Sequence, residues 1–197
     1  DGSIIIKDNF DHRPFSLIKF ADGSTYDFNQ VSQLLEIHGT EGDDTVQGSS
    51  QSEVIYAYGG NDNIDAGAGD DIIYAGDGDD TINAGYGDDV VYGGNGNDTI
   101  YAGDFGKTTI IGGAGDDELY SASQNSRSNE TTYVYNLGDG NDIIHTGIND
   151  DYIQFGDGIT KDSVMFTAVG YDLLITFKNS DGSIIIKDNF DHRPFSL

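Results

Sequence analysis

Cysteine is absent from this chain of 197 residues, and basic residues are scarce. Without cysteine, the chain can form neither disulfides nor thiolate metal sites. Only 9 lysines and arginines stand against 35 acidic residues, so the net charge is −26 and the basic surface that nucleic acids require is missing. An anionic membrane surface would repel the chain for the same reason. The composition therefore excludes nucleic-acid partners and favours cations.

Proline and long hydrophobic runs are also rare. Proline occurs only at Pro14 and Pro194, and no apolar run approaches the roughly 18 residues that span a bilayer, so we expect no membrane insertion. The 28 glycines are about double the usual share of roughly 7 %, which on its own would suit a disordered acidic tract. Hydrophobic residues nevertheless make up 36 % of the chain, with Ile, Val and Tyr regularly spaced. These residues predict an ordered structure.

A long repeat links the two ends of the chain. Residues 1–17, DGSIIIKDNFDHRPFSL, recur letter for letter as residues 181–197. The spacing of 180 residues predicts tandem units of about that length in a longer protein. Because the sequence opens at Asp1 with neither a methionine nor a signal peptide, we expect it to be an internal piece, one period plus an overlap.

A short repeat of nine residues dominates the middle of the chain. From Gly39 it reads GTEGDDTVQ, GSSQSEVIY, AYGGNDNID, AGAGDDIIY, AGDGDDTIN, AGYGDDVVY, GGNGNDTIY, AGDFGKTTII and GGAGDDELY, the eighth copy being one residue longer. Position 4 is almost always Gly, position 6 almost always Asp, and position 8 always Val, Ile or Leu. Residues 133–145 and 146–154 are looser copies.

Each nonapeptide predicts a glycine-rich turn followed by a short strand. Two nonapeptides make a coil of 18 residues, and stacked coils form two parallel sheets with position 8 between them. The predicted inward column is Val46, Ile55, Ile64, Ile73, Ile82, Val91, Ile100, Ile110 and Leu119. At about 1.5–3 kcal/mol per fully buried side chain, so thin a core does not comfortably offset the entropy of ordering the coils. Something else must stabilise them.

The acidic residues at position 6 supply a stabilising mechanism. Stacking places position 6 in two columns, one of Asp44, Asp62, Asp80, Asp98 and Asp117, and the other of Glu53, Asp71, Asp89 and the uncharged Thr108. Carboxylates one rung apart, roughly 5 Å, repel strongly unless a cation lies between them. Ca²⁺ prefers carboxylate and backbone carbonyl oxygens, whereas Mg²⁺ demands strict octahedral geometry and Zn²⁺ prefers His or Cys. The columns therefore predict calcium. We interpret the position-5 residues Asp43, Asp70, Asp79, Asp88 and Asp116 as solvated turn residues.

The repeat resembles the RTX (repeats-in-toxin, haemolysin-type) calcium-binding nonapeptide GGxGxDxUx, clearly over 39–120 and more loosely beyond. The resemblance implies calcium ions between successive turns, bound by the position-6 Asp and by turn carbonyls. The residues so implied are Asp44, Asp62, Asp71, Asp80, Asp89, Asp98 and Asp117, together with Gly60, Gly69, Asp77, Gly78, Gly87, Gly94, Asn95 and Gly96 in the turns.

The candidate ion sites differ in quality. The good pairs are Asp44/Asp62, Asp62/Asp80, Asp80/Asp98 and Asp71/Asp89. Asp98/Asp117 spans the insertion at Phe105, Glu53/Asp71 includes a longer acid, and Asp89/Thr108 lacks one carboxylate. We expect about four to six Ca²⁺ ions, and six would reduce the net charge from −26 to −14.

The expected fold is all-β: a right-handed parallel β-roll with 18 residues per coil, irregular capping strands and one short helix around Phe28–Leu35. Residues 1–36 form the tail of a preceding tandem unit, 37–120 the calcium-binding roll, and 121–197 degenerate coils and capping strands. Strands from 160–180 and 1–25, or their repeat, should cap the roll, because open stacked strands aggregate.

The two sheets should differ on their outer faces. One carries polar residues, whereas the other carries an apolar row with Val54, Ile72 and Val90 beside Tyr56, Tyr74 and Tyr92. So large an apolar patch is unusual in a soluble monomer. Three interpretations remain: cover by 18–36 or 160–190, docking of a neighbouring unit or protein partner, or a tyrosine platform for polysaccharide.

Catalytic motifs are missing. The four histidines show no metal-ligand spacing, and the sequence has no nucleophile elbow, HExxH motif or phosphate loop. We expect no catalytic residues, and a module that folds on calcium after type I secretion, extracellular, as a repeated structural unit whose partners are neighbouring tandem units. The alternative is an accessory domain of a secreted toxin or enzyme that binds polysaccharide.

Overall fold

The computed structural model describes residues 17–27, 36–121, 129–147, 151–178 and 180–187. All regular structure in these residues is β, which confirms the all-β prediction. The short helix predicted around 28–35 lies outside the described residues. Since the described part of the chain forms no helix, it contains none of membrane-spanning length and hydrophobicity.

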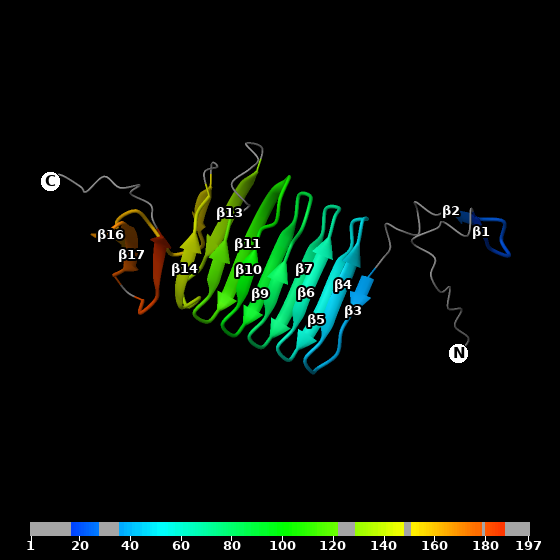
Figure 1. The fold of residues 1–197 in the computed structure, drawn as a ribbon, viewed down its shortest axis with the longest axis horizontal. Coiled ribbons are helices and arrows are strands. Elements are labelled where there is room, and N and C mark those ends of the chain that lie inside the picture. Colours follow the sequence, from blue (N-terminus) through cyan, green and yellow to red (C-terminus); the bar gives the residue numbers. More distant parts are fainter. Residues whose placement is uncertain (1–16, 28–35, 122–128, 148–150, 179, 188–197) are drawn as a thin grey trace.

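Two sheets stack face to face along the chain (Figure 1). The seven-stranded sheet contains, in spatial order, β15 (Tyr152–Phe155), β13 (Glu130–Tyr135), β11 (Lys107–Ala114), β9 (Val90–Asn95), β7 (Ile72–Asp77), β5 (Val54–Gly59) and β3 (Glu36–His38). The nine-stranded sheet contains β16 (Val164–Val169), β17 (Asp172–Phe177), β18 (Ser183–Lys187), β14 (Asn141–His145), β12 (Glu118–Tyr120), β10 (Thr99–Tyr101), β8 (Thr81–Asn83), β6 (Asn63–Gly67) and β4 (Thr45–Ser49). Strands β1 (Leu17–Lys19) and β2 (Thr25–Asp27) form a separate antiparallel pair.

Consecutive strands of the roll alternate between the sheets, so each strand pairs in parallel with the strand two places away in sequence. Ile64 is thus in register with Val46 on one side and Ile82 on the other, a step of one 18-residue coil. The predicted coil length and the parallel β-solenoid are therefore confirmed.

The core is the predicted aliphatic column. All nine position-8 side chains are buried, with the largest exposure, 7 %, at Val46 at the start of the roll. A second inward row comes from position 1, where Ala57, Ala66, Ala75 and Ala84 are fully buried. The small side chains of this row let the two sheets approach closely behind the turns.

The one-residue insertion is absorbed within a single turn. Phe105 adopts a positive φ of 59° and leaves its side chain 63 % exposed. Beyond it, Ile110 pairs with Val91, so the core register resumes in the next strand. A positive φ is unfavourable for any residue with a bulky side chain, and in this exposed turn it leaves the packing of the core unaffected.

The carboxyl-terminal strands continue the roll differently from the coils. Strand β18 pairs in parallel with β14, and β17 and β16 follow as antiparallel strands. The predicted capping strands in this region therefore continue the nine-stranded sheet beyond β14. Beneath them the core becomes aromatic, because Phe177 stacks on Tyr135 at a centroid distance of 4.9 Å and meets Phe155 edge-on at 5.9 Å.

Candidate metal sites

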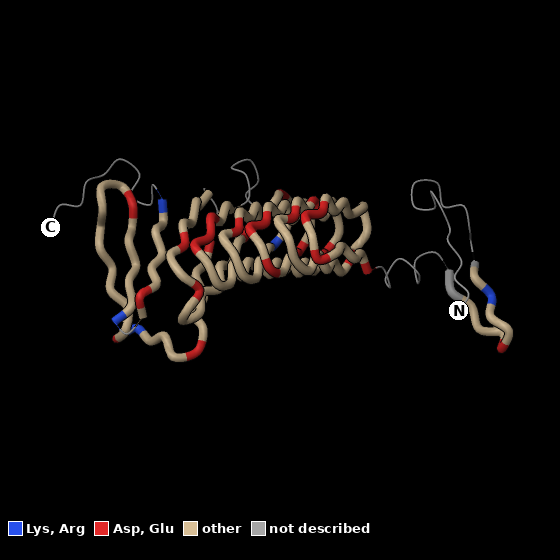
Figure 2. The backbone as a smooth tube through the Cα atoms, turned by 90° about the horizontal axis from the view of Figure 1, so that it is seen from below, with Lys and Arg blue, Asp and Glu red and all other residues tan. Residues whose placement is uncertain are grey.

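The position-6 residues form two rows at the turns, one row leading into each sheet. Figure 2 shows the Asp and Glu segments of the backbone, in red, recurring along the roll. In each row, one carboxylate oxygen accepts the backbone N–H of the position-6 residue one coil earlier. Asp62 Oδ1 accepts from Asp44 at 2.8 Å, and Asp80 Oδ1 accepts from Asp62 at 2.8 Å. The same bond joins Asp98 to Asp80, Asp117 to Asp98, Asp71 to Glu53 and Asp89 to Asp71. The rows therefore tie every coil to the one before it.

The second oxygen of these carboxylates is the unusual one. The Oδ2 atoms of Asp62, Asp71, Asp80, Asp89, Asp98 and Asp117 are buried and accept no hydrogen bond in the structure. A buried acceptor without a partner costs about 1–3 kcal/mol, and more when it is charged. Glycine geometry shows where these atoms point: a Cβ on Gly93 would lie 2.4 Å from Asp98 Oδ2, and one on Gly112 would lie 2.2 Å from Asp117 Oδ2. In these two turns Oδ2 is thus directed toward the position-1 residue of its own turn.

The first residue of each row is satisfied locally. Asp44 Oδ2 accepts the N–H and the hydroxyl of Thr40 at 2.6 and 2.9 Å. Glu53 accepts the N–H of Ser49 at 3.1 Å and also its hydroxyl. At the other end of its row, the Thr108 hydroxyl donates to the carbonyl of Ala102 at 2.9 Å. The orphaned oxygens therefore lie between these ends, in the middle of the rows.

Burial makes these carboxyl groups poor acids. Loss of water, reinforced by the carboxylates of Asp117 and Asp80, raises the pKa of Asp98 to about 8 despite the N–H that Asp80 donates. Burial likewise raises the pKa of Asp71 to about 7 and that of Asp80 to about 6. At neutral pH the ionised form of these carboxyl groups therefore destabilises the fold, and a bound cation would offset this cost.

The predicted turn residues lie where the coils touch. Gly60, Gly69, Gly78, Gly87, Gly94 and Gly96 all have positive φ. A Cβ on Gly78 would lie 2.1 Å from the carbonyl oxygen of Gly60, so only glycine allows the turns to stack. Gly60, Gly78 and Gly96 stack in one column and Gly69 and Gly87 in another, so the turn carbonyls line up along the solenoid.

Two further predicted turn residues, Asp77 and Asn95, are exposed and bonded to each other. The Asn95 amide donates to Asp77 Oδ1 at 2.6 Å. Their carbonyl oxygens accept the N–H of Gly60 and Gly78, each at 2.8 Å. One lone pair of each carbonyl is therefore engaged, and a second is left for a ligand.

The position-5 residues form an outer ladder with the opposite direction. All five predicted turn aspartates are exposed, and their side chains accept from the next coil. Asp79 Oδ1 accepts the N–H of Asn97 at 2.8 Å, and Asp70 Oδ1 accepts that of Asp88 at 2.9 Å. In the longer ladder Asp43, Asn61, Asp79, Asn97, Asp116 and Asn141 alternate in charge, so no two carboxylates are adjacent. These groups are satisfied without a cation.

Sequence reasoning missed Asp142, which extends the first row by one coil. Asp142 Oδ1 accepts the N–H of Asp117 at 3.2 Å, and burial beside Asp117 raises its pKa to about 8. The signal was present, because residues 138–144 read GDGNDII and carry Asp at position 6. In the second row, Asp151 accepts the N–H of Thr131 at 3.3 Å and so occupies the equivalent place.

The donor set fits a hard cation. Within the described ranges, no three acidic or histidine side chains converge on one point. Each candidate site therefore offers carboxylates from neighbouring coils, and the other ligands would be turn carbonyls. An all-oxygen set of this kind suits Ca²⁺.

The outer face of the seven-stranded sheet carries a stack of rings. His38, Tyr56, Tyr74 and Tyr92 follow one another with centroid distances of 5.3, 5.1 and 4.8 Å and interplanar angles of 11° or less. Tyr74 and Tyr92 remain 38 % exposed, and the described strands within 160–190 belong to the other sheet, so they do not cover this face. Because the inner rings cover each other's faces, the stack presents mainly ring edges and hydroxyls.

Comparison with known proteins bears on these repeats. Four copies of the RTX calcium-binding nonapeptide repeat match residues 38–73, 74–106, 106–126 and 136–160, together more than half of the chain. No curated protein matches the chain. Among solved structures, the extracellular lipase LipA from Serratia marcescens is similar over 81 % of this chain and 39 % of the lipase chain, with 18 % identity and a TM-score of 0.37. The matched repeats carry the position-6 rows and their turns, and the chain belongs to the RTX calcium-binding nonapeptide repeat family.

Proposed function

We propose that this chain is a calcium-binding β-roll module that folds on binding Ca²⁺ outside the cell and serves as a repeated structural unit of a large secreted or surface protein. The observation that carries the proposal is the set of six buried Oδ2 atoms without a hydrogen-bond partner, arranged in two rows. Buried polar atoms in folded proteins almost always have a hydrogen-bond partner, so a regular row of buried carboxylate oxygens without one indicates that a cation binds them.

The ion sites follow from the rows. Ca²⁺ supplies positive charge and accepts six to eight oxygen ligands, here the position-6 carboxylates and the turn carbonyls. One ion for each orphaned oxygen would give six, the upper end of the expected four to six. The ligand residues proposed are the position-6 aspartates, now including Asp142, and the glycine turns around them.

The same arrangement makes folding depend on calcium. Without a cation, the folded coil must bury several carboxyl groups whose pKa burial has raised, and the thin aliphatic core offsets little of that cost. Calcium binds the folded coil in preference to the extended chain, so it stabilises the fold by mass action. In the calcium-poor cytosol the chain would stay extended, as export by type I secretion requires, and it would fold in the calcium-rich medium outside.

Within the larger protein, the proposed organisation is tandem and non-catalytic. Residues 1–36 are the tail of a preceding unit, 37–120 the calcium-binding roll, and 121–197 its last coils and capping strands. The exact recurrence of residues 1–17 at 181–197 supports this organisation.

A calcium titration of the chelator-treated chain tests the proposal. Far-UV circular dichroism should show a cooperative transition from coil to β-structure with Ca²⁺ and none with the same concentration of Mg²⁺. Native mass spectrometry of the folded form should find about four to six ions. A chain that is already folded in chelator, or that folds equally with Mg²⁺, would reduce the rows to turn chemistry and overturn the proposal.

A further inference from the structure

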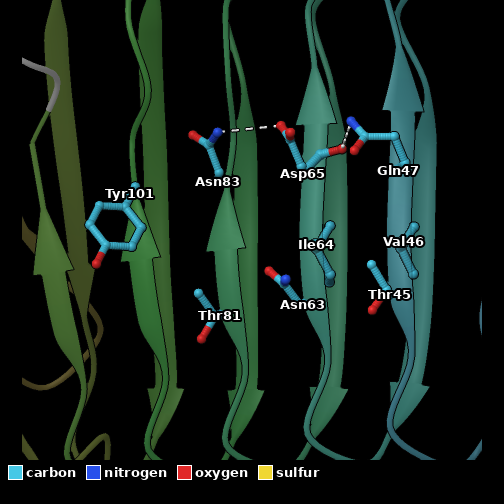
Figure 3. A pocket seen from close by; sticks show the side chains of 9 residues that line it. All are labelled: Thr45, Val46, Gln47, Asn63, Ile64, Asp65, Thr81, Asn83 and Tyr101. Carbon is cyan, nitrogen blue, oxygen red and sulfur yellow. Dashed lines mark hydrogen bonds between the residues drawn. The ribbon is translucent and has the colours of Figure 1, made fainter.

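The outer face of the nine-stranded sheet contains two adjoining hollows. The larger, about 510 Å³, crosses β4, β6 and β8 between their position-7 and position-9 side chains and ends at Tyr101 (Figure 3). The smaller, about 380 Å³, lies beside the turns that follow β6 and β8, with Tyr86 on its wall. Asp65 and Asn83 line both hollows, so this pair is the centre of the combined surface.

Neutral amides hold Asp65 in place. The Asn83 amide donates to Asp65 Oδ1 at 3.3 Å, and the Gln47 amide donates to the Asp65 carbonyl at 3.3 Å. The three side chains come from neighbouring strands and form one line across the sheet (Figure 3). Together they offer carboxylate and amide acceptors beside amide donors, a combination that hydroxyl groups satisfy in both directions.

Tyr101 is the first ring of its stack and its neighbour on the open side is Asn83, whereas Tyr92, the last ring of the other stack, has Ile111 beside it. One face packs on Tyr120 at a centroid distance of 4.7 Å, and Tyr120 packs on His145 at 4.3 Å. Glu118 braces this stack, since its carboxylate lies 2.8 Å from His145 Nε2 and accepts a hydrogen bond from the Tyr120 hydroxyl.

The other face of Tyr101 is turned toward the larger hollow. Its partner on the adjacent strand is Asn83, a shorter residue, and the Tyr101 side chain is 41 % exposed. In Figure 3 the ring lies on the strand next to Asn83, offset along the strand from the line of Gln47, Asp65 and Asn83. A fixed aromatic face thus stands beside hydrogen-bonding groups that are held in place.

We propose that Tyr101, Asp65 and Asn83 form a binding site for a neutral pyranose glycan, with Tyr86 lining an adjoining subsite. The apolar C–H face of a pyranose packs on an aromatic face, whose π-system is electron-rich, while its ring hydroxyls bond to the carboxylate and amides. The hollow volumes fall in the range of about 300–1,000 Å³ that small-ligand sites occupy. The net charge of −26 opposes anionic glycans. Apart from Asp65, the side chains that line the larger hollow are uncharged and include several hydroxyl and amide groups, which suit the hydroxyls of a neutral sugar.

This site goes beyond the calcium-dependent folding proposed above and requires only a folded roll. Its strands β4, β6, β8 and β10 present a ligand group at each rung, roughly 4.8 Å apart, close to the length of one sugar unit in an extended chain. An oligosaccharide running across the strands could therefore reach both hollows.

The test uses the full chain in saturating calcium with maltohexaose, cellohexaose and laminarihexaose as probes. Isothermal titration calorimetry should detect saturable millimolar or tighter binding of at least one probe. In two-dimensional NMR spectra, the bound sugar should shift the side-chain amide signals of Gln47 and Asn83 and leave the backbone signals around Tyr74 unchanged. Circular dichroism of the same samples establishes that the roll is folded, so a failure of sugar binding is distinguishable from a failure of calcium-driven folding.

Substitutions locate the site. Tyr101→Ala should weaken binding by about tenfold, and Tyr101→Phe should retain it, because the ring rather than the hydroxyl packs on the sugar. The matched control is Tyr92→Ala, a position-9 tyrosine on the other sheet, which should leave the affinity unchanged.

Three results would overturn the proposal: no binding of any probe at millimolar concentration, equal loss of affinity in the Tyr92→Ala variant, or binding of tetramethylammonium in place of the sugars. The last outcome would identify the Tyr101 face as a cation site.

Discussion

Replacing Asp80 by asparagine should destabilise the chain in calcium and stabilise it in chelator. Asparagine keeps an oxygen that can accept the N–H of Asp62, now 2.8 Å from Asp80 Oδ1, but removes the charge. Asp80 is 2 % exposed and lies in the middle of its row, between Asp62 and Asp98. The substitution therefore tests the carboxylate as an ion ligand while the backbone contact is preserved.

The two effects have different sizes and opposite signs. Burial raises the pKa of Asp80 from 3.8 to about 6, so its ionised form at neutral pH destabilises the cation-free fold by on the order of 3 kcal/mol. An uncharged asparagine side chain avoids this cost. In calcium, each ion contributes about 2.7 kcal/mol when free calcium is about 100 times its dissociation constant. Because Asp80 borders two gaps in its row, its loss should cost roughly 3–5 kcal/mol in that condition.

Urea unfolding in calcium and trimethylamine-oxide-induced folding in chelator measure the two stabilities. The urea midpoint should fall, and less osmolyte should be needed to fold the variant in chelator. Asp79→Asn is the matched control, because Asp79 is exposed and its acceptor bond to Asn97 survives the change. If Asp80→Asn shifts both transitions in the same direction, or behaves like Asp79→Asn, Asp80 is no calcium ligand.

Three further outcomes follow from the same structure. In chelator, the β-structure seen by circular dichroism should increase as the pH falls from about 8 through about 6. Burial raises the folded-state pKa values of carboxyls such as Asp98 and Asp117, so the folded state binds more protons than the unfolded state and is stabilised by acid. Loss of β-structure over this pH range would contradict the burial of these carboxyl groups. Gly78→Ala should lower the urea midpoint in calcium by the equivalent of about 2 kcal/mol or more, whereas Gly42→Ala, with open space around its Cβ, should change it little. Ile82→Ala should cost about 2–5 kcal/mol in the same assay, because Ile82 is fully buried in the central column, and a cost below about 1 kcal/mol would mean that the core repacks freely.

The coils were predictable from sequence because one spacing decides both their register and their chemistry. A nine-residue period with an aliphatic residue at position 8 and glycine at position 4 leaves little choice of fold, and the position-8 residues from Val46 to Leu119 are buried as expected. Even the insertion at Phe105 was correctly placed, since the repeats on either side of it fix the register.

Features that depend on neighbours outside the period were harder to predict. Asp44 Oδ2 accepts both the N–H and the hydroxyl of Thr40, a local contact that the repeat pattern does not express because the later turns carry no threonine at this position. The stacking of Tyr74 between Tyr56 and Tyr92 depends on side-chain rotation, so the apolar row was expected while its edge-on presentation was not. The continuation of the nine-stranded sheet by β17 and β18 depends on antiparallel pairing between segments that lack the period.

The alternation of strands between the two sheets also limits how such a chain can change in length. Removing one nonapeptide would move every later strand to the opposite sheet, so that tyrosines of the ring stack would join the polar outer face and Thr81 would join the apolar one. Removing two leaves each strand on its own sheet and each carboxylate beside an equivalent neighbour. The smallest interchangeable part of this molecule is therefore the pair of nonapeptides, and duplications or deletions that preserve both surfaces must come in steps of 18 residues.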